Sequence, residues 1–488
     1  MDTHIQELKR EKYPIVIILC FAAFMASLDS YIVNISLPEI ATFFHVDMNA
    51  VSGVVVVFLL FLVGVMLIAG KLADTLGLRN FLLYGYLIFV SGSLACGLSE
   101  SLLMLNISRA IQGIGAAIMT VAPFTIISRY LPSAITGWAF GLLSTFAALG
   151  LTLGAPLGGF ITGNFSWHWI FLINVPIGLT AAFFTYRVIP NSRPDKGQTQ
   201  PKRFDVTGSL ISFLAIAILT FVLSQGQDMG WDSTKTILLS LAFIFLFTTL
   251  IIVEKISTNP VFDFLLLKNR VFTFSTLATV FVFIFLSGNF FVLPFYLTSF
   301  AGLTTQNSGL VLMVYSLVYM ISGPLAGKAS DRIRPEILCA VATLFSGIGC
   351  LVFSIFLDTE SIFPVLLIMV WLGIFMGLFI SPNNNMVMNS VAPGQRGAAS
   401  GMFSTLSRLS MILGVVIFEI LFSMGTGGNG ENMISAMSRH LMVRGFRTAY
   451  FAGAIFLFLG FVFCILIIIN KRNNFTQKGR NGESVATN

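Results

Sequence analysis

The most constraining feature of this chain is a series of long apolar segments that continues almost from end to end. We count fourteen runs of predominantly apolar residues, each about 20 residues or longer, which is the length an α-helix needs to cross the hydrocarbon core of a bilayer. Only helices and closed barrels satisfy their backbone hydrogen bonds in lipid, and uninterrupted apolar runs indicate helices. The chain is therefore predicted to be an all-α integral membrane protein with 14 transmembrane helices.

The predicted spans cover residues 14–37, 50–73, 80–98, 101–127, 134–161, 167–188, 205–224, 234–254, 271–300, 306–328, 336–357, 362–388, 397–423 and 446–470. The connection between the seventh and eighth spans, "SQGQDMGWDSTK", is short but polar.

Composition excludes several other classes of protein. With 56% hydrophobic and only 10% charged residues among 488, the chain does not fit a water-soluble domain. The net charge of +7 is spread singly along the sequence, so no nucleic-acid partner is expected. The five cysteines lie inside apolar runs, and the four histidines show no ligand spacing, so neither a disulfide framework nor a metal site is expected.

The placement of Lys and Arg predicts the orientation in the membrane. Most of the 28 basic residues fall in the N-terminal tail, in alternate connections and in the C-terminal tail. Under the positive-inside rule both termini are then cytoplasmic. The first apolar run lacks a small-residue cleavage pattern, so no cleavable signal peptide is expected. We predict a multi-pass protein of the cytoplasmic membrane.

Two short repeats divide the chain into halves. "GKLAD" at 70–74 and "GKASD" at 327–331 each end a span on the predicted cytoplasmic side. "GWAFG" at 137–141 and "GAASG" at 397–401 each open a later one. Their separation exceeds the roughly 180 to 200 residues that six helices and their loops need, so two further helices are predicted between two six-helix bundles. Parallel repeats of this kind place the substrate site between the halves and give alternating access.

The predicted organisation is a cytoplasmic tail at 1–13, an N-terminal six-helix bundle at 14–188, a cytoplasmic linker at 189–204, a two-helix insert at 205–254, a second linker at 255–270, a C-terminal six-helix bundle at 271–470 and a cytoplasmic tail at 471–488.

Ionisable residues inside the spans are the strongest candidates for function, because each is costly in lipid unless paired or facing a cavity. Asp29 lies eight residues before the outer end of its span, and Arg109 lies eight residues after the outer start of its own. At about 1.5 Å of rise per residue, both sit about 12 Å below the outer boundary. We predict that they meet and couple proton binding to transport, with Gln112 on the same helix face as Arg109. The alternative is a static pair that locks two helices together.

Arg408 and Glu419 share the thirteenth span and, eleven residues apart, point to nearly the same side of a helix. We expect both to face a polar cavity, with Glu419 a further proton-coupling candidate; the alternative for Glu419 is an interfacial position. Asn34, Gln112 and Asn289 are, with Arg408, the candidates for the substrate cavity, although asparagine also serves to join helices.

Several stretches together resemble the major facilitator superfamily, and within it the fourteen-helix drug:proton antiporter branch. The first-helix signature of that branch resembles "LDSYIVNISLP" (28–38). "GKLADTLGLRNFLL", from Gly70, is similar to its loop signature, "RAIQGIGAA", from Arg109, to its fourth-helix signature, and "GAPLGG", from Gly154, to its fifth-helix antiporter signature. "SWHWIFLINVPIG", "RFDVTG" and "NPVFDFLLLKNR" are similar to the branch as well.

The resemblance implies roles in proton coupling for Asp29 and Arg109, and a part for Asp74 and its neighbours in closing a cytoplasmic gate. The gating residues it implies are Gly70, Lys71, Asp74, Arg79, Gly154, Pro156, Gly158, Gly159, Gly327, Asp331 and Arg332. Four positions depart from the family pattern, namely Thr75, Leu78, Ala155 and Arg334.

The sequence thus predicts a secondary active transporter and no enzyme. We expect proton-coupled export of small lipophilic or drug-like compounds by a monomer in contact with membrane lipids, energised by the proton gradient without a cofactor. The alternative on the same fold is a transporter of one metabolite, such as an amino acid or a siderophore. An ATP-driven pump is not expected, because "GPLAGKAS" at 323–330 lacks the spacing of a phosphate-binding loop.

Overall fold

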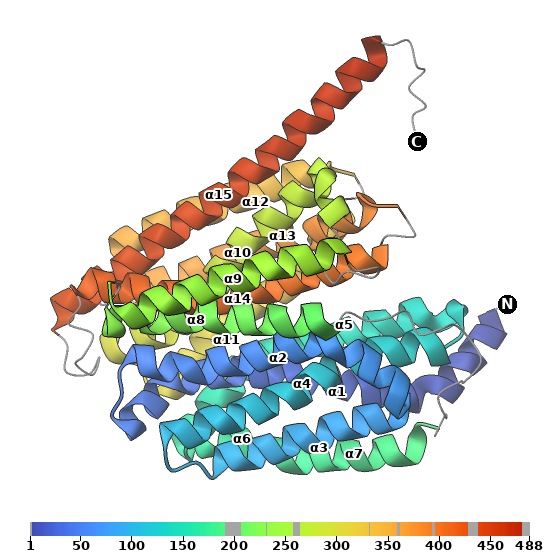
Figure 1. The fold of residues 1–488 in the computed structure, drawn as a ribbon, viewed down its shortest axis with the longest axis horizontal. Coiled ribbons are helices and arrows are strands. Elements are labelled where there is room, and N and C mark those ends of the chain that lie inside the picture. The colour runs from blue at the N-terminus through green and yellow to red at the C-terminus, as the bar shows by residue number, and fades with distance from the viewer. Residues whose placement is uncertain are drawn as a thin grey trace. The chain divides into compact units, whose positions relative to one another are not determined.

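The computed structural model describes residues 2–190, 206–230, 232–256, 264–330, 332–358, 362–392, 396–427 and 438–480. Within these ranges every regular element is helical (Figure 1). The helices are α1 (Asp2–Phe44), α2 (Met48–Leu76), α3 (Leu78–Gly97), α4 (Leu102–Tyr130), α5 (Ser133–Asn164), α6 (His168–Leu172), α7 (Asn174–Val188), α8 (Val206–Met229), α9 (Thr234–Ile256), η1 (Phe264–Lys268), α10 (Arg270–Phe295), η2 (Tyr296–Phe300), α11 (Thr305–Ala329), α12 (Pro335–Phe356), α13 (Phe363–Asn389), α14 (Arg396–Thr426) and α15 (Arg439–Arg480).

The predicted all-α membrane architecture is confirmed. Thirteen segments of the described chain are long and apolar enough to cross a bilayer, and α8 contributes a shorter apolar stretch, Leu210–Leu223, at the seventh predicted span. The first repeat ends α2 and the second ends α11, as their sequence positions required.

Two predicted spans contain a local irregularity, and a proline lies near each. In the sixth span only Ile173 separates α6 from α7, and it keeps helical dihedral angles (φ −61°, ψ −28°); Pro176 has no N–H to donate to the carbonyl of Leu172. In the ninth span α10 ends at Phe295, one residue after Pro294, and the π-helical turn η2 follows. Asn174 is the first residue of α7, which matters below.

The chain divides into two compact units. Unit 1 comprises Met1–Pro260, Phe290–Met313 and Thr426–Met442; unit 2 comprises Val261–Asn289, Val314–Gly425 and Val443–Asn488. In unit 1, α4 packs against both α2 and α3, and α1 packs against α5. In unit 2, α12 packs against α13.

Glycines permit the close helix contacts of unit 1. On α4, a Cβ at Gly113 would lie 2.6 Å from the carbonyl oxygen of Phe58 on α2. On α5, a Cβ at Gly150 would lie 2.5 Å from the carbonyl oxygen of Phe24, and one at Gly158 2.6 Å from that of Ile32. Small residues at such spacing let membrane helices approach backbone to backbone. The glycines of "RAIQGIGAA" and "GLTLGAPLGG" therefore set the distance of α4 and α5 from their neighbours.

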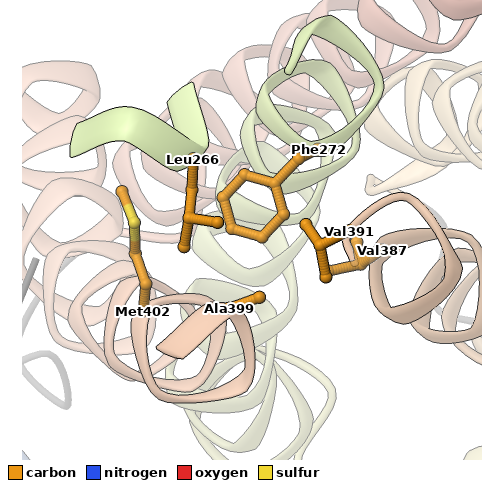
Figure 2. Packing of buried hydrophobic residues seen from close by; sticks show 6 residues of the cluster. All are labelled: Leu266, Phe272, Val387, Val391, Ala399 and Met402. Carbon is orange, nitrogen blue, oxygen red and sulfur yellow. The ribbon is translucent and has the colours of Figure 1, made fainter. Parts of the chain in front are cut away.

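A buried apolar cluster holds together the start of α10, the end of α13 and the start of α14 in unit 2. Figure 2 shows Phe272 with Leu266 on one side and Val387 and Val391 on the other. The members are Leu266, Phe272, Val387, Val391, Ala399 and Met402. Asn269 begins α10 by accepting the backbone N–H groups of Val271 and Phe272 and donating to the carbonyl oxygen of Ser390. This cluster anchors Phe264–Lys268 and the start of α10, which form the described part of the stretch "NPVFDFLLLKNR".

Candidate functional site

Asp29 occupies the middle of a buried polar cluster in unit 1. Its side chain is fully buried, and it projects from α1 between α4 and α7. One carboxylate oxygen, Oδ2, accepts a hydrogen bond from Arg109 Nη1 at 2.7 Å. The other, Oδ1, accepts from Gln112 Nε2 at 2.8 Å and from Asn174 Nδ2 at 3.1 Å. The predicted meeting of Asp29 and Arg109 is confirmed.

Arg109 is bound on every side by unit 1. It is 1% exposed, and its Nε donates to the carbonyl oxygen of Val54 on α2 at 3.0 Å. Its guanidinium lies over the ring of Phe58, 3.9 Å from the centroid, with Phe171 of α6 at 5.6 Å. Aromatic faces and a carboxylate together stabilise a desolvated guanidinium. The arginine is thereby fixed at a depth where water is excluded.

Gln112 connects the two charged residues to α3. Its Oε1 accepts from Arg109 Nη1 at 2.6 Å, while its Nε2 donates to Asp29 and to Ser93 Oγ, the latter at 2.7 Å. The thiol of Cys96 lies 3.7 Å from the same Oε1. Gln112, predicted to contribute to a substrate cavity, is fully buried in this cluster. Its observed contacts are with the charged pair.

Asn174 is a member of the cluster that the sequence analysis did not select. It is 1% exposed and binds Asp29 through its amide nitrogen, whereas its Oδ1 has no hydrogen-bond partner in the described structure. The signal was present, because Asn174 interrupts the apolar run that follows His168 within "SWHWIFLINVPIG". Sequence alone did not show that this side chain points toward Asp29 of α1.

The other predicted cavity residues do not join this cluster. Asn34, one turn beyond Asp29, is 8% exposed, and its Oδ1 has no hydrogen-bond partner among the described residues. Asn289 belongs to unit 2, where its Oδ1 accepts from the hydroxyl of Tyr450 at 3.1 Å. Arg408 is half-buried and Glu419 is 5% exposed, both on α14 of unit 2. The roles of Arg408 and Glu419 stay predictions.

Of the predicted gate around the first repeat, the backbone of Gly70, Lys71 and Asp74 lies in the last turns of α2. Arg79, at the start of α3, places its guanidinium 4.9 Å from the ring centroid of Tyr186 on α7. That contact lies within the first bundle.

The corresponding repeat in the second half is described in part. Asp331 lies outside the described residues, and Arg332 is exposed. A Cβ at Gly327 would lie 2.9 Å from Ser381 Oγ on α13, so the end of α11 sits close against α13. The gating roles of both repeats stay predictions.

The glycines of α5 contact two different helices of unit 1. Gly154 and Gly158 face α1, and α5 continues through Pro156 as one helix. Gly159 faces the other way, where a Cβ would lie 2.6 Å from the carbonyl oxygen of Thr305 and 3.1 Å from Gly309 Cα, both on α11. The glycines of "GAPLGG" thus allow α5 to lie close to α1 on one side and to the start of α11 on the other.

A hydrogen bond accompanies that contact. Thr305 Oγ1 donates to Glu39 Oε1 of α1 at 2.9 Å. Neither residue is marked by a sequence pattern, so this link between the first helix and the start of α11 was not predicted.

Comparison with known proteins decides the family. The model of the major facilitator superfamily matches residues 19–415. The chain belongs to the major facilitator superfamily. It is 28% identical over 459 residues to a riboflavin transporter, RibZ, of Clostridioides difficile, covering 94% of this chain and 98% of that protein. It is 32% identical over 438 residues to multidrug resistance protein 3 of Bacillus subtilis, covering 86% and 81%.

Solved structures support the same fold. A bacterial homologue of the human lysosomal transporter Spinster matches with a TM-score of 0.69 at 16% identity, covering 93% of this chain and 96% of that one. A D-xylose–proton symporter matches with a TM-score of 0.63 at 15% identity, covering 91% and 97%. The chain is a multi-pass membrane transporter of this superfamily, and it is not an enzyme.

Proposed function

We propose that this protein is a proton-coupled exporter of small lipophilic compounds across the cytoplasmic membrane. The observation that carries the proposal is Asp29: a fully buried carboxylate in the middle of a transmembrane helix, bound by Arg109 at 2.7 Å. Ionisable groups at such depth are expensive, and in transporters they commonly form proton relays. Protonation of Asp29 removes the partner charge of Arg109 and so changes the energy of the whole cluster.

The hydrogen bonds of the cluster connect Asp29 to several helices, so protonation of Asp29 affects how those helices are held together. Five elements meet there, because Asp29 of α1 binds α4 and α7, Arg109 binds α2, and Gln112 binds α3. A buried ion pair depends on both members, and loss of one charge leaves the other uncompensated. Proton binding therefore changes contacts between helices, as alternating access by proton coupling requires.

Relatives named as multidrug resistance proteins support lipophilic or drug-like cargo. Few acidic residues lie within the spans, and the charged residues at Asp29 and Glu419 are matched in number by Arg109 and Arg408. This balance favours neutral, monocationic or zwitterionic compounds over dications. We further propose that both termini are cytoplasmic, that the protein acts as a monomer, and that the proton gradient is its energy source without a cofactor.

A specific metabolite transporter is the second candidate. It is favoured by the match to a protein named as a riboflavin transporter, which extends over nearly the full length of both chains. Riboflavin is a neutral aromatic compound, so both candidates fit a cavity without excess charge.

Everted membrane vesicles with ethidium and riboflavin as probes test the proposal. Proton-coupled export predicts uptake that stops when nigericin collapses the pH gradient. Asp29→Asn is expected to abolish that driven uptake, with at least about a 100-fold loss, while counterflow without a gradient persists. Uptake of both probes identifies multidrug export, whereas uptake of riboflavin alone identifies the metabolite transporter. Gradient-driven uptake that survives Asp29→Asn contradicts the proton-coupling role and returns Asp29 to a helix lock.

A further inference from the structure

We infer that Asn174 is the residue that responds to the proton on Asp29: its side-chain amide donates to the carboxylate and, after rotating by half a turn, accepts a hydrogen bond from the protonated acid. This inference rests on the proposed function and extends it to a residue that the family signature of Asp29 and Arg109 does not include. It assigns Asn174 a positioning role, because the proton itself stays on Asp29.

The first observation is that only one of the two polar atoms of the Asn174 amide forms a hydrogen bond. Asn174 Nδ2 donates to Asp29 Oδ1 at 3.1 Å, and Asn174 Oδ1 has no partner although the residue is 1% exposed. Buried polar atoms are nearly always hydrogen-bonded, so an unpartnered one needs an explanation. An amide oxygen that is used only in a second protonation state supplies that explanation.

The second observation concerns the needs of the protonated acid. An ionised carboxylate only accepts hydrogen bonds, whereas a carboxylic acid must also donate one. When a proton from water binds Oδ1 of Asp29, the new O–H needs an acceptor within the same buried space. Asn174 offers one by rotation about its terminal torsion, since the oxygen and nitrogen of an amide occupy nearly the same volume.

The third observation is that the amide of Gln112 cannot accept the hydrogen bond of the protonated acid. Gln112 Oε1 already accepts from Arg109 at 2.6 Å, and Gln112 Nε2 donates to Ser93 as well as to Asp29. Rotation of Gln112 would break each of these bonds. Rotation of Asn174 breaks only the hydrogen bond to the carboxylate, because Asn174 Oδ1 has no hydrogen-bond partner in the described structure.

The titratable and charged groups around Asn174 are few. Asp29 projects from α1 and Arg109 from α4, while the thiol of Cys96 on α3 contacts Gln112. His168 of α6 is hydrogen-bonded to Ser166 through Nδ1. Among these, Asp29 is the group that Asn174 touches directly. The amide therefore senses that carboxyl in particular.

The size of a pH shift tests the inference in everted vesicles, with ethidium as the probe and uptake measured across a range of pH. In Asn174→Leu the carboxylate loses one of its three donors and the acid loses its acceptor. Because each protonation state loses one hydrogen bond, the pH midpoint of uptake is expected to rise by less than about half a unit. Asn174→Ser, whose hydroxyl both donates and accepts, is expected to keep the midpoint of the unchanged protein. A rise of about one unit or more in Asn174→Leu overturns the inference, because Asn174 then serves only as a donor to the carboxylate.

Asn383→Leu is the matched control. Asn383 of α13 is also 1% exposed, donates through its amide nitrogen, here to Thr279 Oγ1 at 2.7 Å, and has an Oδ1 without a partner in the described structure. Its hydrogen-bond partner is a hydroxyl, and within the described residues it has no hydrogen bond to a carboxylate. Its substitution is expected to leave the pH midpoint in place even if the rate changes.

A direct measurement separates this inference from the proposed function. Solid-state NMR of the full chain in lipid reports the protonation of Asp29 from its Cγ shift and the proximity of Asp29 Cγ to Asn174 Nδ2 from dipolar dephasing. The contact is expected above the midpoint and is expected to weaken below it. If Asp29 stays ionised throughout the pH range of transport, the proposed function fails. If Asp29 takes up a proton and the contact to Nδ2 persists unchanged, the inference about Asn174 fails while the proposed function stands.

Discussion

Each of the two units contains a buried polar contact between two of its helices, but the two contacts differ in charge. In unit 1, Asp29 of α1 binds Asn174 of α7 within a cluster that includes Arg109. In unit 2, Asn289 of α10 accepts one hydrogen bond from Tyr450 of α15 at 3.1 Å. One pair of helices is thus joined by an ionic cluster and the other pair by a neutral hydrogen bond.

The difference separates two uses of a buried polar contact. The pair of Asn289 and Tyr450 carries no charge at any pH near neutrality. A change of pH in that range therefore leaves this hydrogen bond between α10 and α15 unchanged. The ionic cluster changes its net charge when Asp29 takes up a proton, and low polarity amplifies the effect. We therefore expect the cluster around Asp29, and not the contact between Asn289 and Tyr450, to respond to a change of pH.

The largest expected effect follows from removing the cation. Arg109→Leu leaves a buried carboxylate with amide donors only, so we expect a loss of about 3–5 kcal/mol in unfolding free energy. Asn289→Leu, the matched change in unit 2, removes one neutral hydrogen bond and is expected to cost about 1–2 kcal/mol. Chemical denaturation in detergent micelles measures both. Equal losses for the two variants contradict the distinction between the halves.

A double variant shows whether charge is the cause. In Asp29→Asn with Arg109→Leu, neither charge remains, and we expect recovery of more than half of the stability lost in Arg109→Leu. Additive losses instead indicate that packing of the Arg109 side chain, for example against Phe58, dominates.

Placing a charge in unit 2 gives the next largest effect. Asn289 is 1% exposed and has Tyr450 as its hydrogen-bond partner. Asn289→Asp buries a carboxylate there with a hydroxyl donor alone, and we expect a loss of about 2–3 kcal/mol at pH 8. Comparison with Asn289→Leu in the same denaturation assay separates the added charge from the lost amide. A fully stable Asn289→Asp protein shows that the contact between α10 and α15 accepts a charge as well as the cluster around Asp29 does.

Much of this site was accessible from the sequence. Apolar runs predicted the helices, and equal depth predicted that Asp29 and Arg109 meet. The rest depended on rotation of helices about their own axes, which depth does not determine. Asn174 of α7 faces Asp29 of α1, and on α5 Gly159 faces α11 while Gly158 faces α1. Such directions follow from packing between segments far apart in the chain.

Tyr450→Phe is expected to have a smaller effect. It removes the hydroxyl that donates to Asn289, whose Nδ2 already has no partner in the described structure. Asn289 is then left buried without a hydrogen bond, at a cost of about 2 kcal/mol. The aromatic contact between Tyr450 and Phe353, with centroids 4.9 Å apart, is retained by the new ring. An unchanged unfolding free energy contradicts the role of this hydroxyl in joining α10 to α15.

Ser93→Ala is expected to have the smallest effect, because the ionic cluster provides alternative partners. The substitution removes the acceptor that Gln112 Nε2 contacts at 2.7 Å, but Nε2 still donates to Asp29 and Gln112 Oε1 still accepts from Arg109. We expect a loss of about 1 kcal/mol, less than for Tyr450→Phe measured side by side. The ionic cluster is then more sensitive than the neutral contact to removal of a charge, yet less sensitive to removal of a neutral member. If Ser93→Ala costs more than Tyr450→Phe, the cluster requires its complete set of hydrogen bonds, and its stability does not come mainly from the pair of charges.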